Sequence, residues 1–137
     1  MIVIDASVAA KWVLDYEQDT DKALVVLEKH KSLIEEIIVP DLLFYEVANM
    51  LATKSRMRSK EMFASLNKIY QAGLKIYYPL EIDVTLAARL AKRYKTSVYD
   101  MLYAVVAKKH KVKLITADEQ FVKQTGFKFV QLLLQKD

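Results

Sequence analysis

Two short runs of mostly β-branched residues, each followed by an acid, constrain the fold of this chain most strongly. One run is Ile2-Val3-Ile4, followed by Asp5, and the other is Leu114-Ile115-Thr116, followed by Ala117 and Asp118. Runs of this kind are typical of strands buried on both faces of a parallel sheet. Ligands bind open α/β sheets outside the carboxyl ends of the strands. We therefore expect Asp5 and Asp118 to face the same site.

Helical and extended patterns alternate along the rest of the chain. Apolar spacing predicts helices at residues 7–14, 19–30, 42–54, 60–72, 84–94, 98–109 and 119–124, and further strands at residues 37–39, 74–78 and 129–134. Gly73 is expected to end one helix, and four residues are expected to cap the starts of others: Asp41, Ser59, Asp83 and Ser97. This alternation favours the α/β class, with a three-layer α/β/α sandwich around a five-stranded parallel sheet in one domain spanning residues 1–137.

The composition of the 137-residue chain restricts its setting and its chemistry. Hydrophobic residues make up 53% of it, enough for a globular core, yet no apolar run approaches the roughly 18 residues of a membrane span. The amino terminus carries Asp5 and does not resemble a secretory signal, and cysteine is absent, so a cytoplasmic protein without zinc–thiolate sites is expected.

Gly73 and Gly126 are the only glycines, which excludes glycine-rich nucleotide-binding loops. His30 and His110 have no neighbouring Ser or Cys motif that would suggest a nucleophile triad.

The excess of basic residues leaves two interpretations open. Lys and Arg number 21 against 17 Asp and Glu, for a net charge of +4. A basic surface around a cluster of acids suits a divalent cation that works on a nucleic acid. The same excess is equally expected of a lysine-rich surface that only keeps the protein in solution.

Two further acids, Glu46 and Asp100, lie within apolar helical runs. Ordinary structural roles exist for each acid, because Asp5, Asp100 and Asp118 all match helix caps. Glu46 is different, since the apolar residues around it predict a helix buried nearly all round. A buried carboxylate is costly unless it is paired or bound to a metal, and one divalent cation would satisfy several acids together. Oxygen ligands alone favour Mg²⁺ or Mn²⁺ over zinc.

Four segments resemble, in order, spacing and context, the four motifs of PIN domains. They are Val3-Ile4-Asp5-Ala6-Ser7, the stretch from Val39 to Asn49 that contains Glu46, Val98-Tyr99-Asp100-Met101-Leu102-Tyr103, and Ile115-Thr116-Ala117-Asp118. The resemblance covers essentially the whole chain, and a single domain of this length is similar to the VapC-type toxins of bacterial and archaeal toxin–antitoxin pairs. It implies a five-stranded parallel sheet with the first strand at its centre. It also implies a metal-dependent endoribonuclease that retains all four acids.

The resemblance further implies roles for individual residues. The catalytic and metal-binding residues would be Asp5, Glu46, Asp100 and Asp118, holding one or two Mg²⁺ or Mn²⁺ ions. Small polar residues would orient these acids or a bound water: Ser7, Asn49 and Thr116. Basic residues would contact the RNA backbone, although a solvated loop explains most of them better: Lys11, Lys54, Arg56, Arg58 and Lys60.

Three kinds of partner are expected, and none is a membrane. The first is the RNA substrate, and the second is a small VapB-type antitoxin that covers the acidic pocket with Arg or Lys side chains. The third is a second copy of the chain in a homodimer. A sheet this small cannot bury all of the tyrosines that the chain places on helices and strand ends, and exposed tyrosines are common at interfaces. These are Tyr70, Tyr77, Tyr78 and Tyr94.

Other functions are weighed against this one. A haloacid-dehalogenase phosphatase needs a second Asp two residues after the first, where this chain has Ser7. A phosphoacceptor receiver domain needs paired acids after its first strand, and Asp5 stands alone. Within PIN domains, the alternatives are a nuclease of RNA processing or quality control, and a non-catalytic RNA-binding module. The latter would be expected to have lost an acid.

Overall fold

Five parallel strands form one sheet in the computed structural model, which describes residues 1–14 and 18–133. The strands are β1 (Ile2–Ile4), β2 (Ile37–Pro40), β3 (Lys75–Tyr77), β4 (Lys113–Thr116) and β5 (Val130–Leu132). Their order across the sheet is β3-β2-β1-β4-β5, so the first strand is central, as the resemblance implied. In the register of the sheet, Ile2 lies between Ile37 of β2 and Lys113 of β4.

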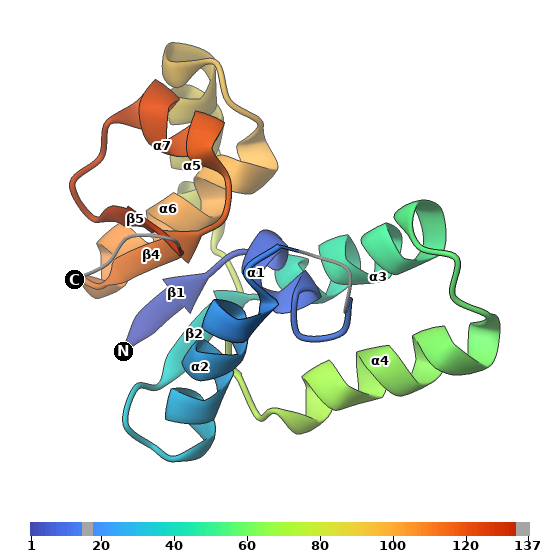
Figure 1. Ribbon diagram of the computed structural model, residues 1–137. Helices are drawn as coiled ribbons and strands as arrows, with labels where there is room; N and C mark the ends of the chain where they lie inside the picture. Colours follow the sequence, from blue (N-terminus) through green and yellow to red (C-terminus); the bar gives the residue numbers. More distant parts are fainter. Residues whose placement is uncertain (15–17, 134–137) are drawn as a thin grey trace.

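Helices cover the sheet in two groups (Figure 1). The elements are α1 (Ala6–Ala10), α2 (Thr20–Lys31), α3 (Leu42–Lys54), α4 (Ser59–Gln71), α5 (Glu81–Tyr94), α6 (Val98–His110) and α7 (Glu119–Thr125). Helix α6 packs against β1, β2 and β4, and α5 packs against α6. Helices α3 and α4 contact each other and form a hairpin that projects from the body of the molecule (Figure 1). The three-layer α/β sandwich predicted from the sequence is confirmed.

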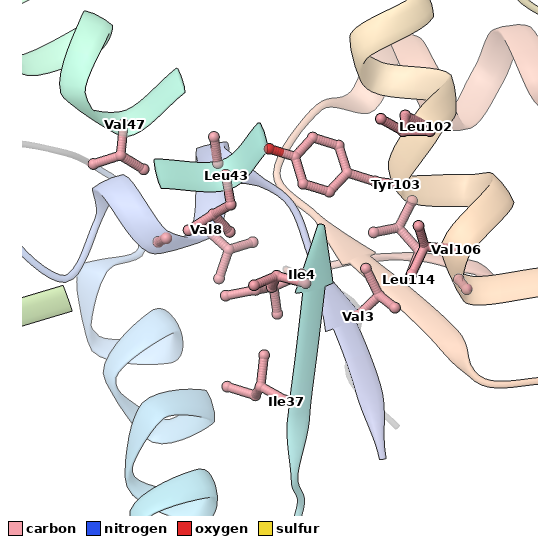
Figure 2. Packing of buried hydrophobic residues seen from close by; sticks show 14 of the residues in the cluster. Val3, Ile4, Val8, Ile37, Leu43, Val47, Leu102, Tyr103, Val106 and Leu114 are labelled. Carbon is pink, nitrogen blue, oxygen red and sulfur yellow. The ribbon is translucent and has the colours of Figure 1, made fainter. Parts of the chain in front are cut away.

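The core lies between the central strands and the helices around them. Val3 and Ile4 of β1 are fully buried, and so is Leu114 of β4. Every residue of α6 from Met101 to Ala107 is buried, because this helix lies between the sheet and α5. Figure 2 shows these side chains packed together, with the hydroxyl oxygen of Tyr103 directed toward the ribbon of α3. This core packing therefore holds in place the carboxyl end of the sheet and the start of α6, where the acids lie.

Several helix ends differ from the predicted ones. Ser97 caps α6 as predicted, because its hydroxyl accepts a hydrogen bond from the amide of Asp100 at 3.0 Å. Asp83 is the third residue of α5 and not its cap, yet its carboxylate accepts the amide hydrogen of Leu80 at 2.8 Å. Asp41 precedes α3 without a side-chain capping bond, and Ser59 is the first residue of α4. Two of the four predicted caps, Asp41 and Ser97, thus occupy the cap position, and only Ser97 makes the capping bond.

The surroundings of Glu46 also differ from the prediction. Helix α3 buries Leu43, Phe44, Val47 and Leu51, but its opposite face is open to solvent, with Tyr45 66% exposed. The prediction of a helix buried nearly all round was therefore wrong. The physical reason is that α3 belongs to the projecting hairpin, where only one face meets the sheet and α1. Glu46 lies at the boundary and is half-buried.

Candidate active site

Asp5 lies at the carboxyl end of the central strand, where the chain turns into α1. Its Oδ1 accepts hydrogen bonds from the Ser7 hydroxyl at 2.5 Å and from the amide of Val8 at 3.3 Å. Its Oδ2 accepts a hydrogen bond from the Thr116 hydroxyl at 2.5 Å. A carboxylate has about four acceptor positions, and these bonds use three of them. Asp5 is therefore fixed in place and retains capacity for one more electropositive group.

The end of β4 supplies the groups that fix Asp5. The amide of Ala117 donates to the Ser7 hydroxyl at 3.1 Å, and the amide of Asp118 donates to the Thr116 hydroxyl at 3.0 Å. Each hydroxyl thus accepts a backbone hydrogen and donates its own hydrogen to Asp5. Ser7 and Thr116, which the sequence singled out, both lie against Asp5 in this arrangement. The carboxylate of Asp118 caps α7 by accepting the amide hydrogen of Phe121 at 3.1 Å.

Asp100 and Glu46 approach the site from two helices. Asp100 is in the first turn of α6, where the positive end of the helix dipole favours a carboxylate. Glu46 is in the second turn of α3, and its Oε1 accepts a hydrogen bond from the Tyr103 hydroxyl at 2.6 Å. Tyr103 is 1% exposed and belongs to α6, one turn after Asp100. The two helices are thereby connected through a partly buried hydrogen bond at the site.

Burial is the main electrostatic influence on these acids. It raises the pKa of Asp5 from 3.8 to about 6, against the hydrogen bonds from Ser7, Thr116 and Val8, and Asp100 raises it slightly further. Burial also raises the pKa of Glu46, again with a contribution from Asp100 and against the hydrogen bond from Tyr103. The pKa of Asp100 is raised by burial and by Asp118, against a hydrogen bond from Ser97. Asp100 therefore acts on Asp5 and Glu46, and Asp118 acts on Asp100.

The acids of the site bring negative charges close together in a partly buried environment. Burial and the charge of Glu46 raise the pKa of the Tyr103 hydroxyl, so this group remains a donor and cannot add charge. Carboxylates that repel one another and lose water are stabilised by a bound cation. Within the described part of the chain, no three His, Asp or Glu side chains are close enough to hold a metal ion by themselves. Mg²⁺ matches such a site, because it is commonly held by one or two carboxylates and keeps several waters.

The other polar residues singled out in the sequence lie further out. Asn49 is on the exposed face of α3, one turn after Glu46. Arg56 and Arg58 are exposed in the turn between α3 and α4, and Lys54 ends α3 next to them. Lys11 follows α1 and is only 7% exposed, so little of it is open to a large ligand.

Tyr103 is the residue of the site that sequence reasoning left without a role. It is three residues after Asp100 in the third motif, and this spacing places both side chains on the same face of a helix. An aromatic residue in an apolar helix nevertheless resembles any other core residue. The only sequence signal was the polar hydroxyl in an otherwise apolar run, since a buried tyrosine hydroxyl needs a hydrogen-bond partner.

The comparisons with known proteins decide the family. The sequence matches the PIN domain family over residues 2–126. The chain belongs to the PIN domain family. It is also 30% identical over 128 residues to Ribonuclease VapC3 of Pyrobaculum aerophilum, in an alignment that covers 90% of this chain and 93% of that protein. This PIN domain is therefore of the VapC type.

Solved structures support the same fold. VapC20 of Mycobacterium tuberculosis, described as a toxin that cleaves the sarcin–ricin loop, superposes with a TM-score of 0.70 at 12% identity, covering 91% of this chain and 95% of its own. A chain of a toxin–antitoxin complex from Klebsiella pneumoniae superposes with a TM-score of 0.68 at 14% identity, covering 99% and 100%. At these identities the likeness concerns the fold of the PIN domain.

None of the described helices of this chain is long and apolar enough to cross a membrane.

Proposed function

We propose that this PIN domain is a VapC-type endoribonuclease that hydrolyses RNA phosphodiesters with Mg²⁺ or Mn²⁺ and acts as the toxin of a toxin–antitoxin pair. The observation that carries the proposal is the position of Asp5. It ends the central strand, is fixed by Ser7 and Thr116, and has Asp100 near enough to raise its pKa, at the edge of the sheet where α/β proteins bind ligands. The kinship with Ribonuclease VapC3 indicates which reaction such a site performs.

The donor atoms of the site fit a hard divalent cation. Asp5 and Asp100 are the proposed direct ligands of one or two ions, and Glu46 and Asp118 bind directly or through water. All of these donors are carboxylate oxygens, and no His or Cys competes for a softer metal. A bound cation supplies positive charge at the scissile phosphate and lowers the pKa of a water that attacks it.

The protein side chains have separate tasks in this mechanism. Ser7 and Thr116 keep both oxygens of Asp5 oriented, because their own hydrogens are committed to it. Tyr103 holds one oxygen of Glu46 and leaves the other free to accept a hydrogen bond from water. Such preorganisation reduces the rearrangement needed when charge develops on the phosphate. Asn49 is proposed to assist one turn beyond Glu46.

Basic residues of the helical hairpin are proposed to hold the RNA backbone on one side of the acids. Arg56 and Arg58 are exposed between α3 and α4, and Lys54 is adjacent. Arg and Lys contacts to phosphates supply affinity without sequence preference. We favour these residues over Lys11, because most of the Lys11 side chain is covered.

A small antitoxin and a second copy of the chain are the proposed protein partners. The complex from Klebsiella pneumoniae is described as a toxin–antitoxin complex, and its toxin-like chain shares this fold. An Arg or Lys of the antitoxin would pair with the acids and compete with the cation. For the homodimer, the support is exposed aromatic surface: Tyr70 is 59% and Tyr78 66% exposed, whereas Tyr77 and Tyr94 are half-buried.

The decisive experiment is RNA cleavage by the purified protein and its Asp5→Asn variant. Wild-type protein should cleave single-stranded RNA with Mg²⁺ or Mn²⁺, stop on addition of EDTA, and resume when the cation is restored. Asp5→Asn should bind RNA without cleaving it, with an unchanged circular dichroism spectrum. Equal cleavage by both proteins would refute the assignment. RNA binding without cleavage by the wild type would favour a non-catalytic PIN module, and cleavage without toxicity on expression would favour RNA processing.

A further inference from the structure

A lysine-rich pocket lies at the opposite edge of the sheet from the acids. Its volume is about 760 Å³, and it is lined by Met1, Ile2, Glu35, Lys108, Lys111, Val112, Lys113, Lys128 and Phe129. We call it the lysine pocket. These residues come from the starts of β1 and β4, the end of α6, and the segments before β2 and β5. Figure 1 shows the amino terminus, which belongs to the pocket, at the end of β1 remote from α1.

The charges of the lysine pocket are strongly unbalanced. All four of its lysines are exposed, and within the described residues none has a carboxylate in salt-bridge contact. Its single acid, Glu35, is already paired with the amino group of Met1 at 2.9 Å. A surface that serves only solubility mixes charges of both signs, and like charges gathered in one hollow repel one another. The lysine pocket is therefore suited to an anionic ligand.

Part of the lining of the lysine pocket is apolar. Ile2 and Val112 line it, and Phe129 ends a column of aromatic rings. The ring of Phe129 stacks on Phe127 at 5.3 Å between centroids, and Phe127 meets Tyr94 edge-on at 5.0 Å. Positive groups around an aromatic surface are the combination that binds single-stranded nucleic acids, with lysines on phosphates and rings against bases.

Helix α6 spans the distance between the lysine pocket and the acids. Asp100 is in its first turn and Lys108 in its last, which places the two sites about 12 Å apart along the helix axis. Strand β1 makes the same connection, with Ile2 lining the pocket and Asp5 following the other end. Both sites are thus attached to the same helix and the same strand, at a separation that a single RNA strand can span.

We propose that the lysine pocket is a second binding site for single-stranded RNA, which holds the backbone of the strand outside the acidic site. This inference rests on the proposed ribonuclease function for the identity of its ligand. The lysines act as point charges on phosphates, so the site contributes affinity and no sequence preference. Its occupant is the same RNA strand whose cleavage the acids perform.

The test measures RNA binding without cleavage, in the Asp5→Asn background. Lys113→Gln/Lys128→Gln is compared with the control Lys92→Gln/Lys123→Gln, which removes two equally exposed lysines from α5 and α7. Fluorescence anisotropy with a labelled 20-nucleotide RNA is measured from low to high salt. The pocket variant should lose about five- to twentyfold in affinity, and its log–log salt slope should fall by about 1.4, as expected for two lost phosphate contacts on a single strand. The control should bind as the parent does, and both variants should melt at the parent temperature.

The possible outcomes separate this inference from the proposed function. Unchanged affinity of the pocket variant overturns the inference, and equal losses in both variants also overturn it, because total charge alone would then explain binding. A selective loss in the pocket variant supports it, even if the wild-type protein proves unable to cleave RNA. Conversely, suppose that the wild type cleaves RNA while the pocket variant binds RNA as the parent does. That result supports the ribonuclease function and overturns the second site.

Discussion

Tyr103 donates a hydrogen bond to Glu46 over 2.6 Å, joining residues that lie 57 positions apart in the chain. The bond connects α6, which carries Asp100, to α3, which carries Glu46. Because Tyr103 is buried and Glu46 is only half-buried, the surrounding core fixes the tyrosine, and the tyrosine positions Glu46. The hydroxyl also partly offsets the burial that raises the pKa of Glu46. Tyr103 is thus a positioning residue for an acid of the site.

Removing this hydroxyl should change both stability and the pH dependence of the enzyme. Tyr103→Phe leaves Glu46 without its donor, so the pKa of Glu46 should rise further and the acidic limb of the pH–rate profile should move to higher pH. The loss of a buried hydrogen bond to a charged group should cost about 1–2 kcal/mol of unfolding free energy at pH 7.5. Urea denaturation and cleavage rates between pH 5 and 9 test these expectations.

The matched control is Tyr99→Phe, in the same helix. Tyr99 is 61% exposed, so the loss of its hydroxyl should change neither stability nor the pH profile by a measurable amount. A Tyr103→Phe protein that is less stable but has an unchanged pH profile would show that the bond is structural only.

Asp5 should reduce the stability of the cation-free protein at neutral pH. Its pKa is 3.8 when unfolded and about 6 when folded, so the folded state binds the proton more tightly. The unfavourable contribution is therefore absent below about pH 4, grows as the pH rises, and is complete above pH 6. The rise in pKa corresponds to at most about 3 kcal/mol, and Asp5→Asn also weakens hydrogen bonds, so we expect a gain of about 1–2 kcal/mol at pH 7.5.

Denaturant titrations in EDTA at pH 4 and pH 7.5 check this prediction. Glu61→Gln serves as the comparison, since Glu61 is an exposed acid on α4. A gain from Asp5→Asn that is as large at pH 4 as at pH 7.5 would contradict the role assigned to the carboxylate charge.

Divalent cations should stabilise the protein, because they bind the folded cluster and not the unfolded chain. At a Mn²⁺ concentration about 100 times the dissociation constant, the gain is about 2.7 kcal/mol, which shifts the melting temperature by several degrees. The shift should be smaller at pH 5.5 than at pH 7.5, because protons compete for Asp5. Asp100→Asn should abolish most of it and Glu61→Gln should keep it. An identical shift in Asp100→Asn would place the ion elsewhere.

The sequence predicted the position of the site in the fold better than the contacts between the side chains of the site. Asp5 and Asp118 were placed at one sheet edge because buried parallel strands have a recognisable composition and their carboxyl ends coincide. The central position of β1 followed from the likeness to PIN domains, and the strand order bears it out. These features depend on local pattern and on family, which a single sequence contains.

Contacts between distant segments were beyond the sequence. The pairing of Tyr103 with Glu46 depends on where the fold places α3 relative to α6, and no local pattern specifies that placement. The open face of α3 was missed for the same reason, because the apolar residues around Glu46 do not indicate a projecting hairpin. The lysine pocket is assembled from four separate segments, so its lysines resembled scattered surface charges until the fold brought them together.

Lys111 offers a substitution in which stability and RNA binding should change in opposite directions. It follows α6 with a φ of 57°, in the left-handed region where glycine is favoured, and it also lines the lysine pocket. Lys111→Gly should relieve the backbone and raise the unfolding free energy by about 0.5–1 kcal/mol, while weakening RNA binding. Lys95→Gly is the matched control, because Lys95 follows α5 with a φ of 59° and does not line the pocket. Both variants should melt at higher temperature than the wild type, and only Lys111→Gly should bind RNA less tightly in anisotropy titrations. If the two variants bind RNA with equal affinity, Lys111 does not contact the RNA, since the charge removed and the backbone geometry are the same in both.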